Sequence, residues 1–97
     1  MRKTFPLSVP GREAPRVVEA IKNEVRKYVK RERRKALPEG VDFWDFDCKA
    51  GREPAVAEKK HVEELIPAID LASAGEWESV YIEILAIPGH RQSKDKQ

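Results

Sequence analysis

The sequence predicts an α+β fold, a two-layer sandwich in which two helices cover one face of a three- or four-stranded sheet. Three observations lead to this fold class. Two segments alternate apolar and polar residues as strands do, two others repeat apolar residues at the helical period, and a third apolar run is rich in β-branched residues. In chain order they read β-α-β-α-β. The 97 residues suit one domain, which we expect at residues 1–91, before a disordered polar tail at 92–97.

The first half of this pattern predicts a strand followed by a long helix. Residues 3–9 alternate, and Pro6 among them favours an edge strand because proline cannot donate to a ladder. Pro15 suits the first turn of the helix, where a missing N–H costs nothing. Residues 37–40, Leu-Pro-Glu-Gly, are expected to end it. The apolar stripe of the helix consists of Val17, Val18, Ile21, Val25, Tyr28 and Val29.

The second half predicts a strand, a helix and a central strand. Residues 41–48 alternate, with Trp44, Phe46 and Cys48 on the apolar face. Residues 55–60 fit either a short edge strand or the approach to a helix. The connections between strands are long enough for parallel pairing, so strand direction stays open.

The second helix is expected at residues 60–74, where apolar residues recur at positions i, i+3, i+4 and i+7. Pro67 lies either in its first turn or at a kink, and Gly75 is a natural C-cap. Residues 80–87 form the most apolar run and predict the central strand, ended by Pro88-Gly89.

Charge is distributed unevenly along the chain. Residues 22–35 hold eight cationic side chains against two carboxylates, a net charge of +6, so the remainder of this +2 chain carries −4. No apolar run approaches the roughly 18 residues of a membrane span, and we expect no membrane partner. The single cysteine excludes an intrachain disulfide and fits a reducing compartment. We therefore expect a cytoplasmic protein.

The basic part of the first helix is the main candidate binding site. Its rows of cations lie well away from the apolar stripe, so we expect them to face solvent, where they could neutralise phosphates, with Tyr28 near enough to stack on a base. Arg33 is expected to contact a carboxylate instead. The alternative is a solvated face that balances the carboxylates elsewhere, and the spacing matches no specific DNA-binding motif. The candidate residues are Arg26, Lys27, Lys30, Arg31, Arg34 and Lys35.

Several other residues have side chains that could bind ligands or perform chemistry. His90 and Arg91 follow the central strand and form a second candidate anion contact, against the alternative of a plain turn. Cys48, on the apolar face, is expected to be buried and inert. Neither it nor the two histidines have the spacing of a zinc site. We expect no catalytic residue, metal or cofactor.

An acidic motif follows the basic helix at residues 42–47. Asp42, Asp45 and Asp47 could bind a cation or act as acid and base, but carboxylates alternating along a strand are typical of its wet face. We expect them to form ion pairs with cations of the first helix.

Three stretches resemble a known family. "MRKTFPL", "KYVKRERRKALPEGVDFWDFDCK" and "ESVYIEILAIPGHR" are similar to a family of short bacterial proteins catalogued as a domain of unknown function. The resemblance covers most of the chain, and "LPEGVDFWDFDC" is its most distinctive part. It implies no activity, cofactor or catalytic residue and supports treating the whole chain as one domain.

These observations favour a small module that binds RNA or another phosphate-bearing polyanion and performs no chemistry. The alternative is a protein-protein interaction or self-associating module, in which the same helix meets an acidic partner or the acidic remainder of another copy. A small enzyme comes third, since it would need a deep pocket with perturbed titratable groups.

Overall fold

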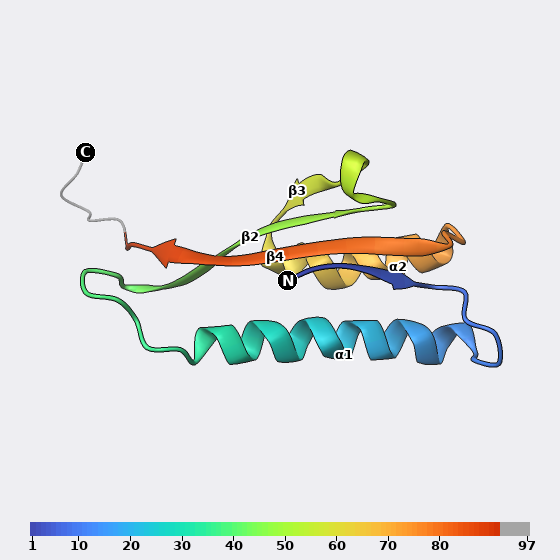
Figure 1. Ribbon diagram of the computed structural model, residues 1–97, viewed down its shortest axis with the longest axis horizontal. Coiled ribbons are helices and arrows are strands. Elements are labelled where there is room, and N and C mark those ends of the chain that lie inside the picture. The colour runs from blue at the N-terminus through green and yellow to red at the C-terminus, as the bar shows by residue number, and fades with distance from the viewer. Residues whose placement is uncertain (92–97) are drawn as a thin grey trace.

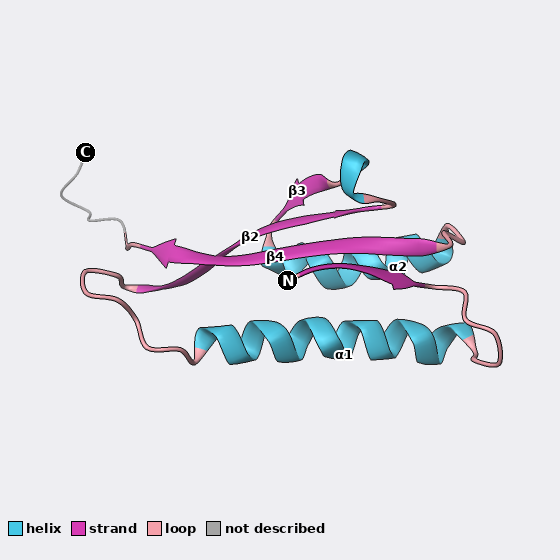
Figure 2. Ribbon diagram, in the orientation of Figure 1, coloured by secondary structure: helices cyan, strands magenta, loops and turns pink. Residues whose placement is uncertain are grey.

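The structure, a computed structural model, describes residues 1–91. Its principal elements are β1 (Arg2–Pro6), α1 (Ala14–Arg33), β2 (Phe43–Gly51), β3 (Glu58–Lys60), α2 (Leu65–Ala74) and β4 (Ser79–Gly89) (Figure 1). Two short 3-10 helices, η1 (Pro54–Val56) and η2 (Val62–Glu64), precede β3 and α2. Figure 2 shows a layer of strands beside the two helices, as an α+β fold requires. The expected tail at 92–97 lies outside the described residues.

The four strands form one sheet in the order β1-β4-β2-β3, and every neighbouring pair is antiparallel. Strand direction, which the sequence left open, is therefore antiparallel throughout this sheet. β4 is central: it pairs with β1 over Ser79–Glu83 and with β2 along almost its whole length. The ambiguous segment at 55–60 contains both η1 and the short edge strand β3.

One contiguous core fills the space between the sheet and the helices. Val80, Ile82 and Ile84 alternate along β4 and are completely buried, as are Leu65 and Ile69 of α2. The apolar stripe of α1 completes the core, with Tyr28 only partly buried. Trp44, expected in the core, is also partly buried and packs against its edge. Alternation in the strands and the 3.6-residue period in the helices therefore give the faces that we expected.

α1 ends earlier than expected, because its last helical residue is Arg33 and no helix continues to Leu37. Pro15 lies in its first turn, as predicted. The main-chain N–H of Arg34 reaches back to the carbonyl of Arg31 at 3.2 Å, closing the last turn. At about 1.5 Å per residue, the 20 residues of α1 span twice the length of the 10-residue α2.

Different local contacts define the two ends of the second helical segment. At its start, the main-chain N–H of His61 donates to Oε1 of Glu64 at 2.8 Å. Pro67 is in the first turn of α2, so it causes no kink. At its end the residue in the left-handed region is Glu76, with φ 57°, and Gly75 has φ −80°.

The hydrogen bonds after α2 form a Schellman motif. The N–H of Trp77 donates to the carbonyl of Ala72 at 3.1 Å, and the N–H of Glu76 donates to that of Ser73 at 3.0 Å. Gly75 lies close to the next tryptophan: a Cβ there would lie 3.0 Å from Nε1 of Trp77, a tight contact with a side chain.

β4 continues through Pro88-Gly89, where we expected it to end. Pro88 is tolerated because β1 pairs with β4 no further than Glu83, and Ile84 donates to the carbonyl of Met1 on that side. Pro88 points its nitrogen toward the same, open edge, so no ladder bond is lost. Gly89 lies beneath the ring of Phe43, since a Cβ at Gly89 would come within 2.3 Å of that ring.

Candidate phosphate-binding surface

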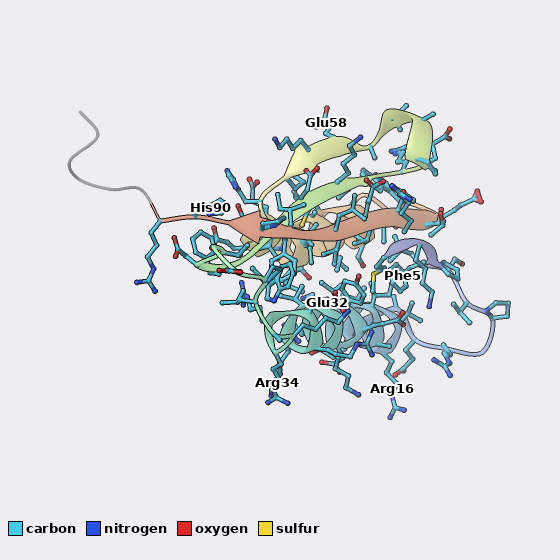
Figure 3. The ribbon with its side chains drawn as sticks, turned by 60° about the vertical axis from the view of Figure 1, so that its left-hand side comes forward. Phe5, Arg16, Glu32, Arg34, Glu58 and His90 are labelled. Atoms are coloured by element: carbon cyan, nitrogen blue, oxygen red, sulfur yellow. The ribbon has the colours of Figure 1, made fainter. Side chains whose placement is uncertain are left out.

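The six candidate cations lie along the C-terminal half of α1 and just beyond it, and all six are exposed. Figure 3 shows Arg34 and Arg16 pointing away from the sheet, while Glu32 points toward it. This follows from the helical period, because the buried stripe fixes one side of α1 and the cations occupy the rest of its circumference. We call this set the basic surface; it comprises Arg26, Lys27, Lys30, Arg31, Arg34 and Lys35.

Only two members of the basic surface form ion pairs among residues 1–91. Nη1 of Arg26 lies 3.4 Å from Oε1 of Glu19, and Nζ of Lys35 lies 2.9 Å from Oε2 of the buried Glu32. The Arg26–Glu19 pair is exposed on both sides, and such pairs contribute about 0–1 kcal/mol. The remaining four cations, which have no carboxylate within 4.0 Å in that part of the chain, are Lys27, Lys30, Arg31 and Arg34.

Two arginines of α1 lie over aromatic rings. The guanidinium carbon of Arg31 is 5.5 Å from the centre of the Tyr28 ring, which occupies the face that we expected to be open to a base. That of Arg33 is 5.4 Å from the centre of the Phe46 ring. Among residues 1–91 no carboxylate lies within 4.0 Å of Arg33, so the expected contact with a carboxylate is not formed in that part of the chain.

A groove with a volume of about 640 Å³ lies between α1 and the segment formed by η2 and the start of α2. We call it the α1–α2 groove. Its aliphatic side chains come from both sides and are Val25, Val29, Val62 and Ile66. Its basic rim belongs to α1 and consists of Arg26, Lys30, Arg33 and Arg34. Glu63 stands on the opposite side. The groove thus places a basic rim beside an apolar floor.

Nothing in the residue pattern identified this groove beforehand. Val62 and Ile66 have the i, i+4 spacing of one helical face and served only to predict the second helix. Both are only partly buried, because α2 begins at Leu65 and lies beside only part of α1. Their relation to α1 depends on that tertiary arrangement.

The acidic motif does not face the basic surface, so the expected ion pairs with α1 are wrong. Asp45 and Asp47 alternate with the buried residues Phe46 and Cys48, which places their side chains on the sheet face away from the helices. Asp42 and Asp45 instead accept main-chain hydrogen bonds. Oδ2 of Asp42 binds the N–H of Arg91 at 2.8 Å, and Oδ1 of Asp45 binds the N–H of Phe46 at 2.8 Å.

The Asp45 contact has a structural explanation. Phe46 points its N–H toward the β3 side of β2, but β3 pairs only with residues 48–50. Its N–H would otherwise stand unpaired at an open strand edge, and the carboxylate of Asp45 satisfies it. The acidic motif therefore stabilises the ends of β2 and β4.

The second candidate anion contact is separate from the basic surface. His90 and Arg91 are exposed and directly follow Gly89, the last residue of β4. Figure 3 shows His90 at the end of the sheet layer and Arg34 beside the helix layer. The main-chain N–H of Arg91 is held by Asp42, as expected of an ordered strand-terminating turn. Anion binding at this position stays a prediction.

Cys48 is completely buried, in agreement with its assignment as a small apolar residue. Burial raises the pKa of its thiol to about 11, with smaller contributions from Asp47 and Asp45. A thiol with so high a pKa is overwhelmingly protonated at neutral pH, which is unfavourable for a nucleophile. Within residues 1–91, no three His, Cys, Asp or Glu side chains gather closely enough to hold a metal ion.

The uncovered face of the sheet carries a polar cluster that the sequence did not reveal. The hydroxyl of Tyr81 donates to Oε1 of Glu83 at 2.7 Å, and Nε of Arg2 lies 3.6 Å from the same oxygen. The Tyr81 hydrogen bond lowers the pKa of Glu83, helped by the charges of Arg2 and Lys49 and opposed by partial desolvation. These residues come from three neighbouring strands and meet only through the sheet register.

Residues 1–95 match the family described as "Family of unknown function (DUF6172)". The chain belongs to this family. The match agrees with the resemblance noted in the sequence, and the family description assigns no activity. A search of curated proteins and a search of solved structures each found no match. Of the helices described, none has the length and apolar character needed to cross a membrane.

Proposed function

We propose that this protein binds RNA, or another phosphate-bearing polyanion, through the basic surface of α1, and that it does so without performing chemistry. The single observation that supports this most strongly is the set of four exposed cations without ion pairs, Lys27, Lys30, Arg31 and Arg34. A helix that used its cations only to balance the chain's own carboxylates would have them paired.

The arrangement of these cations suits a phosphate backbone. Arg26, Lys30 and Arg34 are four residues apart, so they advance by about 6 Å per step along one side of α1. Neutralising several phosphates at once releases condensed counterions, which is the main source of affinity in sequence-independent binding. The guanidinium groups can also contact two phosphate oxygens simultaneously.

The test is a fluorescence anisotropy titration with a single-stranded RNA of about 16 nucleotides, the upper end of usual site sizes for such domains. Affinity should fall steeply between about 50 mM and 200 mM salt, with a logarithmic slope of roughly −0.7 for each phosphate contacted. The triple variant Arg26→Glu, Lys30→Glu and Arg34→Glu should abolish binding while its circular dichroism spectrum stays that of the wild type.

A matched control distinguishes an effect of the basic surface from an effect of the total net charge. The triple variant Arg12→Glu, Arg52→Glu and Lys59→Glu makes the same change in net charge at exposed positions outside the basic surface. It should retain most of the RNA affinity. Absence of wild-type binding even near 10⁻⁴ M protein at low salt, about the limit of ordinary non-specific association, would contradict the proposal. The alternative, an acidic protein or a second copy of the chain, would then lead.

A further inference from the structure

We propose that the α1–α2 groove receives one unpaired nucleobase, so that the protein selects single-stranded over duplex RNA and favours bases that carry an exocyclic amino group. This inference rests on the proposed function and specifies the ligand of the same surface. It follows from three features of the groove: its shape, its rim and the carboxylate that faces the rim.

The shape of the groove results from the unequal lengths of the two helices. Because α1 has 20 residues and α2 has 10, α1 extends beyond the start of α2, and the partly buried Val62 and Ile66 lie there beside the buried Val25 and Val29. The resulting volume of about 640 Å³ lies within the range of sites that hold small organic groups. An aliphatic floor favours a flat, largely apolar group over a hydrated one.

The rim of the groove is continuous with the basic surface. Arg26, Lys30 and Arg34 belong to both, so a backbone held on the basic surface brings its bases to the mouth of the groove. Arg33, which belongs to the groove alone, has its guanidinium over the Phe46 ring, and this contact restrains its orientation. Guanidinium planes are surfaces on which unstacked bases stack in RNA complexes.

Glu63 decides which chemical groups are accepted inside. A carboxylate only accepts hydrogen bonds, and it repels phosphate, so the far side of the groove suits the amino edge of a base. Cytosine offers such an amino donor, whereas uracil presents carbonyl oxygens there. In a duplex the bases are paired and stacked and cannot enter the groove. A rigid duplex lying across the groove would also bring its phosphates toward Glu63. Only an unpaired strand can place phosphates on one rim and a base against the other.

The residues that line the groove include no aromatic side chain, so we expect the protein to distinguish bases by the hydrogen-bonding groups on their edges. Proteins that bind single strands without sequence preference stack successive bases on aromatic rings instead. Here the aliphatic floor contributes mainly desolvation, so the preference between bases depends on Glu63. Its carboxylate can accept a hydrogen bond from an amino group but not from a carbonyl oxygen.

The experiment compares oligo(C), oligo(U) and an RNA duplex of equal length by anisotropy at one low salt concentration. Oligo(C) should bind at least about fivefold tighter than oligo(U), as expected for a hydrogen bond to a charged group, and both should bind tighter than the duplex. Glu63→Gln should bring the C-to-U ratio close to one, because an amide can donate to uracil as well as accept from cytosine. Glu63 is exposed and its side chain holds no partner within residues 1–91, so this variant should fold normally.

A second variant tests the floor. Ile66→Phe should fill part of the groove, weaken binding of single strands and leave duplex binding unchanged, with circular dichroism as the check on folding. Equal affinity for all three RNAs, or a C-to-U ratio that Glu63→Gln leaves intact, would overturn this inference and leave the proposed function standing. If no RNA binds but an acidic amphipathic peptide does, the proposed function fails as well, and the groove is a protein-docking site.

Discussion

The indole nitrogen of Trp44 donates a hydrogen bond of 2.9 Å to the main-chain carbonyl of Lys35. Carbonyls at a helix C-terminus lack partners within the helix, and this bond satisfies one just beyond the end of α1. It also ties β2 to the basic surface, because Trp44 belongs to the strand and Lys35 to the surface. The position of the last cations is therefore linked to the sheet.

The first prediction concerns this bond. Trp44→Phe keeps an aromatic ring but removes the donor, and it should lower the free energy of unfolding by about 1 kcal/mol, as measured by urea denaturation. Trp77→Phe serves as a control, because the indole nitrogen of Trp77 makes no hydrogen bond within residues 1–91. Equal stability of Trp44→Phe and the wild type would show that the bond contributes nothing.

A second prediction uses the turn after α2. Glu76 has a left-handed conformation that glycine adopts without steric cost, so Glu76→Gly should raise the free energy of unfolding by roughly 0.5–1 kcal/mol. Glu78→Gly, an exposed position with an ordinary backbone conformation, should give no stabilisation. A stabilising effect there equal to that of Glu76→Gly would rule out backbone strain as the cause.

A third prediction concerns pH and Cys48. The pKa of the Cys48 thiol is raised to about 11 in the folded protein from 9.0 in an exposed thiol. The protonated thiol therefore makes its full contribution to the free energy of unfolding below pH 9. Between these values the unfolded chain loses the proton and the folded protein keeps it. The free energy of unfolding should therefore fall as pH rises, by at most about 1.4 kcal/mol per pH unit.

The measurement compares urea denaturation of the wild type and Cys48→Ala through this alkaline range. The difference in stability between the two should shrink as pH rises, since only the wild type has the thiol, and the other ionising groups are common to both. A constant difference would contradict the raised pKa. At neutral pH the native thiol should also react slowly with thiol reagents, and rapid reaction without unfolding would restore a chemical role for Cys48.

A fourth prediction concerns Glu83. Because the Tyr81 hydrogen bond is the main cause of its lowered pKa, Tyr81→Phe should raise that pKa, which carboxyl-carbon NMR can follow. A lowered pKa means that the ionised carboxylate stabilises the fold above the ordinary value of 4.5, and this contribution is lost as pH falls through the folded pKa. Tyr81→Phe should thus destabilise the protein at neutral pH and much less in acid. Tyr28→Phe should leave the pKa of Glu83 unchanged.

The elements that could be predicted from the sequence are those set by local periodicity. The apolar stripe of α1, from Val17 to Val29, fixes which of its sides is buried, and the exposure of Lys30 and Arg34 follows from the same geometry. The alternation at residues 41–48 likewise predicted that Phe46 and Cys48 lie on the buried face of β2.

The features that escaped prediction depend on contacts distant in sequence. Strand direction depends on how β4 lies between β1 and β2, and long connections permit either direction. Asp45 was assigned to ion pairs because residue type and charge suggested them, whereas its actual partner is the N–H of the next residue at an open edge. The α1–α2 groove exists because α2 is short and starts at Leu65, which no property of Val62 or Ile66 alone reveals.

The central position of β4 has a consequence for how the protein is made. During synthesis the ribosome releases β1, α1, β2, β3 and α2 before β4, yet both β1 and β2 find their main partner in β4. Until Ser79–Gly89 has emerged, only the short β2–β3 pairing can form, and the apolar stripe of α1 has no complete surface to cover. We therefore expect the sheet to form only after β4 has emerged and inserted between β1 and β2, two segments that were already present.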